Sequence, residues 1–468
     1  MKINNAATAR FLSYSIGLIV QVAIIFLLTT KLEIYQFGLW GISMSFIFIL
    51  STASQMSYFQ NIEKYFPNYS LEKRHYFLIK YIKTIFIVNP IILLFLFLTN
   101  YFGYFEKFNI ENINYLLIMI AFLSTIESCL VILDGYSVAT RNSKIFDSYD
   151  LFIYKVPRFF IFYLLLNSGY SVFYLIFTTI LLRSLLLMSI LIKEFKNLRN
   201  FFKSFKNNSV FNENFQNIKY NFSAFGNKSL YLSFINILFL ITSNSLLNID
   251  IAHYSLMVII LNNLRPIMST IPSLLPPIIS SSIKNNIDLK YEIKNIEIIN
   301  QILISVFLLF VLTVVQFNDL FSIFFSDYFD EIYKLIFLSA FASTLNSIYY
   351  TKYLKQLFSK RERDILKFNC FNYAFCIFTF YVIYKYFYLI NFIYIFIFYE
   401  ILFFLYINYL SNNRKKFIPN IREFSLMYLL SMFIVSAYIL DFFNFYFFII
   451  VPLGLIFDFK VIYKNIEK

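Results

Sequence analysis

Long apolar stretches separated by short polar segments run through the chain from Phe11 to Ile462. Most are about 17 to 25 residues long, which is enough to cross a hydrocarbon core of roughly 30 Å as a helix. The pattern predicts the spans 11–30, 37–59, 84–105, 113–134, 152–167, 171–192, 222–247, 253–281, 298–317, 332–351, 368–384, 389–410, 424–441 and 444–463. We therefore expect an all-α integral membrane protein with 14 transmembrane helices.

Two of these spans are less regular than the others. Lys155, Pro157 and Arg158 stand near the start of the fifth span, and the eleventh ends at Lys385. A total of 12 helices is therefore the alternative to 14.

The composition supports a membrane protein, since 59% of the residues are hydrophobic and only 14% are charged. The first span follows Lys2 and Arg10, as the apolar core of a signal peptide does. It is longer than such a core, usually about 7 to 15 residues, and no small-x-small cleavage site follows it. We expect it to be a permanent helix.

The formal net charge of +14 results from basic residues that cluster in every second connection between spans, as in 193–206, 352–363 and 414–422. The intervening connections hold few basic residues, which are accompanied by acidic ones such as Glu33, Glu106, Glu111, Asp327 and Glu331. This alternation follows the positive-inside rule and predicts cytoplasmic N- and C-termini. It also argues against nucleic acid as the partner, because a nucleic-acid site would gather the charge in one patch.

The longest connection, 193–219, is basic, rich in Asn and placed after six spans. We predict an N-terminal six-helix bundle at 1–195, a cytoplasmic basic linker at 196–220, a C-terminal six-helix bundle at 221–411, and two additional helices with a cytoplasmic tail at 412–468. The stretches "QFGLWGISMS" and "IAHYSLMVII" begin the second span of each half. They indicate a weak internal repeat, which is common in transporters with a site between two repeats.

The eighth span contains "NNLRPIMSTIPSLLPP", which places a fixed charge, Arg265, at membrane depth. A charge at the bilayer centre costs at least about 2.5 to 3.5 kcal/mol, so it usually faces a bundle interior or a water-filled cavity. On a helix one polar stripe would hold Asn262, Arg265, Ser269, Ser273, Pro276 and Ser280. We predict substrate binding by Arg265, Asn262, Ser269 and Ser273; the alternative for Arg265 is a structural ion pair.

The same stretch carries four of the chain's nine prolines, Pro266, Pro272, Pro276 and Pro277. Each removes a backbone donor and strains the preceding turn. Irregular backbone at membrane depth is tolerated where protein or water covers it. The prolines thus predict either a hinge or a static kink.

Arg183 lies near the middle of the sixth span and is the second central cation. Guanidinium groups bind phosphate or carboxylate through paired hydrogen bonds, so Arg183 and Arg265 would suit an anionic substrate. Alternatively, Glu127 or Glu400, both near the middle of their spans, neutralises Arg183. These two carboxylates are also the candidates for proton or cation coupling.

Motifs for chemistry are missing from the sequence. It has no glycine-rich phosphate loop, GxSxG, HExxH or paired CxxC, and neither histidine has partners at metal-ligand spacing. We expect neither a cofactor nor a metal, and no enzymatic activity.

Four segments resemble bacterial polysaccharide flippases of the O-antigen or capsule type. "TTKLEIYQFGLWGISMS" looks like the turn into their second helix, and "YFQNIEKYFPNYSLEKRHYF" looks like their basic first cytoplasmic loop. "NIDIAHYSLMVIILNNLRPIMSTIPSLLPPIIS" is similar to their proline-bearing eighth helix. "LFSIFFSDYFDEIYKLIFLSAFASTLNSIYYTKYLKQLFSKRERD" looks like their ninth to tenth helices.

The resemblance implies the multidrug/oligosaccharidyl-lipid/polysaccharide exporter (MOP) superfamily, with two six-helix bundles around a central cationic cavity and, here, two C-terminal helices. It implies alternating-access transport of undecaprenyl-pyrophosphate-linked oligosaccharide across the cytoplasmic (inner) membrane of a bacterium, for surface polysaccharide biosynthesis. The implied partners are the lipid-linked glycan, the lipid bilayer and a polysaccharide polymerase machinery.

Two other functions compete with this interpretation. A multidrug or organic-cation exporter of the same superfamily would need a cavity dominated by carboxylates, whereas two arginines are central here. A polysaccharide polymerase or ligase usually exposes a large external loop with catalytic residues, and the external connections of this chain are short.

Overall fold

The computed structural model describes residues 2–55, 58–105, 113–140, 143–195, 218–243, 248–269, 275–276, 278–280, 300, 304, 332–358, 361–384 and 391–411. Within these ranges the regular structure is helical and contains no strand. Seven of the described helices are long and apolar enough to cross a membrane. The predicted all-α membrane class is confirmed. The spans at 424–441 and 444–463 lie outside the described residues, and so does 298–317 apart from two helical positions.

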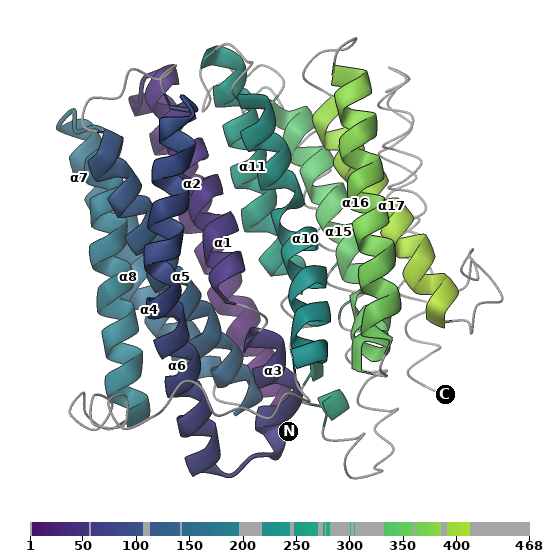
Figure 1. The fold of residues 1–468 in the computed structure, drawn as a ribbon. Coiled ribbons are helices and arrows are strands. Elements are labelled where there is room, and N and C mark those ends of the chain that lie inside the picture. The colour runs from purple at the N-terminus through teal and green to yellow at the C-terminus, as the bar shows by residue number, and fades with distance from the viewer. Residues whose placement is uncertain are drawn as a thin grey trace, which may run out of the picture.

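The first part of the chain forms a bundle of long, roughly antiparallel helices, on the left of Figure 1. Its elements are α1 (Lys2–Lys31), α2 (Ile34–Ser54), α3 (Tyr58–Tyr65), η1 (Phe66–Asn68), α4 (Leu71–Tyr101), α5 (Ile113–Ala139), α6 (Ser143–Tyr149), η3 (Asp150–Lys155), α7 (Val156–Asn167) and α8 (Val172–Phe195). We call residues 2–195 the first half.

The second half lies beside it on the right of Figure 1 and comprises residues 218–411. Its described helices are α10 (Ile218–Ser243), α11 (Asn248–Ser269), α15 (Ile332–Phe358), α16 (Glu362–Tyr384) and α17 (Asn391–Ser411). The predicted linker, 196–220, falls outside the described residues as far as 217.

Several helix boundaries differ from the predicted spans, and three of them have a visible cause. The second span was predicted to reach residue 59, but α2 ends at Ser54 and a separate short helix starts at Tyr58. The third begins at Leu71 instead of 84, because the Ser70 hydroxyl accepts a hydrogen bond from Lys73 N and caps the helix. The fifth runs from Ser143 to Asn167 through η3, since its charged residues are paired inside the bundle.

The two halves meet most closely where α2 crosses α11. A Cβ atom on Gly41 would lie 2.1 Å from Ser255 Oγ and 3.0 Å from Ser255 Cα, and one on Gly38 would lie 3.0 Å from Ile251 Cγ2. The Ser255 hydroxyl donates to the Gly38 carbonyl at 3.4 Å. Small residues allow such an approach of two backbones in a membrane. The weakly repeated segments of the sequence therefore contact each other directly.

A second contact joins the halves near the end of the molecule where α1 meets α2. The Tyr104 hydroxyl donates to the Leu240 carbonyl at 2.9 Å and lies 2.6 Å from Ser243 Oγ. Burial raises the pKa of Tyr104 to about 12, opposed by the hydrogen bond with Ser243. The phenol is thus protonated at neutral pH and keeps its hydrogen-bond donor.

The opposite end, beside α3 in Figure 1, is also bridged. The Asn68 amide donates to Ser280 Oγ at 3.2 Å, and the Ser280 hydroxyl donates to the Lys64 carbonyl. In this structure the halves are therefore in contact at both ends.

Candidate functional site

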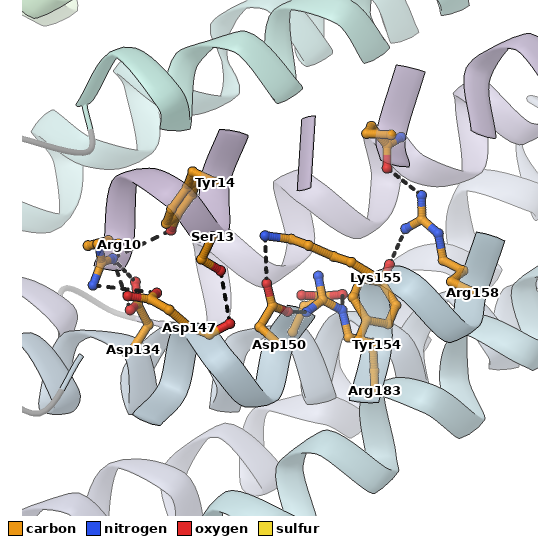
Figure 2. A network of polar contacts seen from close by, with 12 residues as sticks. Arg10, Ser13, Tyr14, Asp134, Asp147, Asp150, Tyr154, Lys155, Arg158 and Arg183 are labelled. Carbon is orange, nitrogen blue, oxygen red and sulfur yellow. Dashed lines mark hydrogen bonds and ion pairs between the residues drawn. The ribbon is translucent and has the colours of Figure 1, made fainter. Parts of the chain in front are cut away.

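A chain of charged and polar side chains runs through the interior of the first half, along α1 (Figure 2). It draws on α1, α5, α6, η3, α7 and α8. Its members are Arg10, Ser13, Tyr14, Gln21, Glu127, Asp134, Asp147, Asp150, Tyr154, Lys155, Arg158 and Arg183. We call it the first-half network.

Arg183 is at the centre of this network and interacts with two carboxylates. Its Nε lies 2.7 Å from Glu127 Oε1, and its Nη1 donates to Asp150 Oδ1 at 2.9 Å. The guanidinium carbon also lies 3.6 Å from the centroid of the Tyr154 ring. The side chains of Arg183 and Glu127 are 18% and 21% exposed. Of the two carboxylates that the sequence offers as partners, Glu127 is the one in contact with Arg183.

The π-helical segment η3 brings Asp150, Tyr154 and Lys155 into the network. A π turn inserts an extra residue into a helix and changes the direction of the following side chains, often at functional sites. Here Lys155 Nζ reaches Asp150 Oδ2 at 2.8 Å. The lysine side chain passes over Gly17, where an added Cβ atom would lie 2.9 Å from Lys155 Cδ and Nζ. Glycine at position 17 therefore makes room for this ion pair.

Arg10 forms a second group of contacts towards the N-terminal end of α1. Its Nη2 donates to both carboxylate oxygens of Asp134, at 3.0 and 2.9 Å, and its Nη1 lies 4.0 Å from Asp147 Oδ1. The Ser13 hydroxyl donates to the backbone carbonyl of Asp147 at 2.9 Å. These contacts connect α1 with α5 and α6.

Arg158 has uncharged hydrogen-bond partners. Its Nη2 donates to Gln21 Oε1 at 2.5 Å, and its Nη1 donates to the Tyr154 hydroxyl. The guanidinium also packs over the rings of Tyr154 and Phe162. Figure 2 shows this group on its right-hand side, beyond Lys155 and Arg183.

The substrate-binding residues predicted on the eighth span are only partly described. Asn262 pairs with Asn236 of α10: its Nδ2 donates to Asn236 Oδ1 at 3.1 Å. Arg265, Pro266 and Ser269 belong to α11, but their side chains lie outside the described part. Pro272, Ser273 and Pro277 lie outside the described residues altogether, and Pro276 is helical and buried.

Glu400 lies in the second half on α17 and is fully buried. Its Oε2 accepts a hydrogen bond from the Tyr349 hydroxyl of α15 at 2.7 Å. It contacts none of the residues of the first-half network. The two candidate coupling carboxylates are therefore separated, one in each half.

Comparison with solved structures identifies the architecture. A chain described as protein A superposes with a TM-score of 0.59 at 11% identity, covering 89% of this chain and 96% of that one. A structure described as a crystal structure of MATE in complex with MaD3S superposes with a TM-score of 0.57 at 13% identity, covering 88% and 96%. The chain has a MATE-type fold.

Comparisons of sequence alone give no further assignment. No family model matches the chain, and no curated protein matches it. In the described part of this MATE-type fold, no group of three or more His, Cys, Asp or Glu side chains is arranged to hold a metal ion.

Sequence reasoning missed most of the first-half network of the MATE-type fold. Asp134, Asp150, Lys155 and Arg158 received no role, although each is a charge within or next to an apolar stretch. Such residues are rare in membrane segments and usually have a partner or a function. Applying that rule to every charged residue, instead of only the most central ones, would have found them.

Proposed function

We propose that this chain is an alternating-access transporter that flips an undecaprenyl-pyrophosphate-linked oligosaccharide across the bacterial inner membrane for surface polysaccharide biosynthesis, with both termini in the cytoplasm. The observation that carries the proposal is the MATE-type fold, which extends over nearly the whole chain. The resemblance to flippases in four segments supports the choice of cargo. A polymerase machinery would then receive the translocated glycan.

In this mechanism the cargo's glycan and pyrophosphate pass between the halves while the lipid tail stays in the bilayer. Opening towards either side requires breaking one set of contacts between the halves. The Tyr104 hydrogen bonds join them at one end and the Ser280 hydrogen bonds at the other. Cargo shifts the equilibrium only by binding one state more tightly than the other.

Arg265, with Asn262, Ser269 and Ser273, is proposed to bind the anionic part of the cargo. Arg183 is held by Glu127 and Asp150, so a direct role for it in binding would require exchange of these partners. Glu127 and Glu400 are proposed either to couple transport to an ion or to serve in charge pairing.

Replacing Arg265 with alanine is expected to reduce glycan translocation roughly tenfold or more, since a hydrogen bond to a charged group contributes about 1.5 to 3 kcal/mol. The measurement is surface polysaccharide and accumulated lipid-linked oligosaccharide in cells with equal protein levels. Arg363→Ala is the matched control, because Arg363 is an exposed arginine at the start of α16. Equal transport by both variants would exclude the role of Arg265.

Pro266, within α11, and Pro272, Pro276 and Pro277, which follow it in the sequence, are proposed as a hinge. Replacing Pro272 and Pro276 together with alanine should restore backbone donors and straighten this segment. We expect transport to fall while the protein level and melting temperature stay the same. Full activity of the double variant would instead indicate a static kink.

Export of organic cations is the second candidate function, favoured by two carboxylates in the first-half network, Glu127 and Asp150, that are 21% and 13% exposed. Binding of tetraphenylphosphonium to the purified protein, lost in Glu127→Gln, would support it. Accumulation of a lipid-linked oligosaccharide on deletion of the gene, without sensitivity to cationic drugs, would support the flippase.

A further inference from the structure

The first-half network contains four cations and four carboxylates, but they are unevenly distributed along α1. Towards its N-terminal end, Arg10 faces both Asp134 and Asp147. Near the middle of the membrane helices, Lys155, Arg158 and Arg183 accompany only Glu127 and Asp150. The middle of the network therefore carries one positive charge more than its carboxylates neutralise.

Arg158 is the residue that holds this excess charge. Lys155 and Arg183 each form an ion pair at 2.9 Å or less, whereas the contacts of Arg158 in the described structure are with Gln21, Tyr154 and Phe162. Its Nε atom is buried and has no hydrogen-bond partner. Glu127 and Asp150 are near enough for electrostatic interaction with Arg158 but form no ion pair with it.

Arg158 is only 8% exposed, and a buried guanidinium that forms no ion pair is costly at membrane depth. Neutral acceptors offset part of this cost, but an anion would offset more, because hydrogen bonds between two charged groups are shorter and stronger. Gln21 lies in the middle of the predicted first span and is half-buried, so protein does not enclose its side chain completely.

We infer that Arg158 and Gln21 form an anion-binding site in the first half, which receives the phosphate or carboxylate group of the transported molecule. An arriving anion replaces Gln21 Oε1 as the acceptor for Arg158 Nη2. The Gln21 amide then turns its NH2 group towards the anion, and the Tyr154 hydroxyl, which accepts from Arg158, still has its own proton to donate. This inference rests on the proposed function only for the identity of the cargo.

The site is connected to the rest of the network through Tyr154. Its hydroxyl accepts from Arg158 while its ring lies against the Arg183 guanidinium. A bound anion that moves Arg158 would therefore also move the ring that supports the Arg183 pair with Glu127 and Asp150. Anion binding at Arg158 is thereby linked to the arrangement of α5, η3 and α8.

The test is Gln21→Glu, which places a permanent carboxylate against Arg158. This variant adds an ion pair, so its melting temperature should equal or exceed that of the wild type. The full-length protein in lipid nanodiscs is titrated with inorganic pyrophosphate at low salt, and in a second arm with glucuronate. We expect wild-type protein to bind at least one of these anions, and Gln21→Glu to bind it about tenfold more weakly or worse, the loss of one charged hydrogen bond.

Gln21→Met is the matched control, since it removes the amide acceptor without supplying a charge. It also removes the NH2 group proposed to donate to the anion, so we expect binding weaker than in the wild type but stronger than in Gln21→Glu, because the positive charge of Arg158 is not neutralised. Binding of pyrophosphate but not glucuronate would identify the lipid pyrophosphate as the ligand, and the reverse result an acidic sugar. No anion binding by wild-type protein, or equal binding by wild type and Gln21→Glu, would overturn the inference.

The same variants separate this inference from the proposed function. Loss of anion binding in Gln21→Glu, in a protein whose deletion leaves lipid-linked glycans unchanged, would support the site and reject the flippase. Normal glycan translocation by Gln21→Glu would reject the site and leave the flippase standing.

Discussion

Gly41→Ala is expected to abolish transport although it adds only one methyl group. The new Cβ atom would lie 2.1 Å from Ser255 Oγ, 2.3 Å from Ser255 Cβ and 3.0 Å from Ser255 Cα. The contacts with Cβ and Cα cannot be relieved by a side-chain rotation, so α2 and α11 must separate. Overpacking of this kind destabilises a folded protein by about 1 to 3 kcal/mol. Here it destabilises every conformation in which α2 and α11 cross. Glycan translocation in cells measures the loss of transport, and the melting temperature of the purified protein measures the loss of stability.

Two further variants isolate the cause. Ser255→Gly removes the two nearest atoms, so Gly41→Ala combined with Ser255→Gly should recover part of the transport. Gly226→Ala is the control within one half: its new Cβ atom would meet the flexible end of Leu366 at 2.5 Å, which can move aside. We expect it to be nearly neutral. Equal loss in Gly41→Ala and Gly226→Ala would mean that the crossing of α2 and α11 has no special role.

The sequence predicted the helices well because apolar length alone determines whether a segment can cross a membrane. The span 113–134 lies within α5, and the span 171–192 begins one residue before α8 and otherwise lies within it. The boundaries failed where a polar segment is helical: residues 71–83 extend α4 because a cap and the continuing backbone hydrogen bonds, not hydrophobicity, decide where a helix starts.

The position of the helices relative to one another could not be predicted in the same way. Gly38 and Gly41 stood out as part of a weak repeat, but nothing in the sequence says that the repeated segments touch. Their contact depends on how the two halves pack, which one sequence does not specify.

The first-half network shows the same limit for charged residues. Lys155 and Arg158 weakened the predicted fifth span, since a charge counts as a penalty when each helix is considered alone. In the structure α1, α5 and α8 supply Gln21, Glu127 and Arg183 around them, and that penalty is offset by partners from other helices. The π turn that directs Asp150 and Lys155 has no recognisable sequence signal.

Arg183→Gln is expected to destabilise the first half, because it leaves Glu127 without its ion-pair partner while Asp150 keeps Lys155. Removing one member of a buried pair costs about 3 to 5 kcal/mol. The side chains here are 18% and 21% exposed, so we expect a smaller loss of roughly 1 to 3 kcal/mol in the free energy of unfolding. Denaturant unfolding of the protein in detergent micelles provides the measurement.

The double variant Arg183→Gln with Glu127→Gln then distinguishes pairing from substrate binding. If the pair is structural, removing both charges should recover most of the lost stability, and the coupling free energy should be about 1 kcal/mol or more. Transport should then recover together with stability, because a purely structural pair gives the charge of Arg183 no other role. Restored stability without transport would instead show that Arg183 also contacts the cargo. Strictly additive losses would mean that the contact between Arg183 and Glu127 contributes nothing to stability.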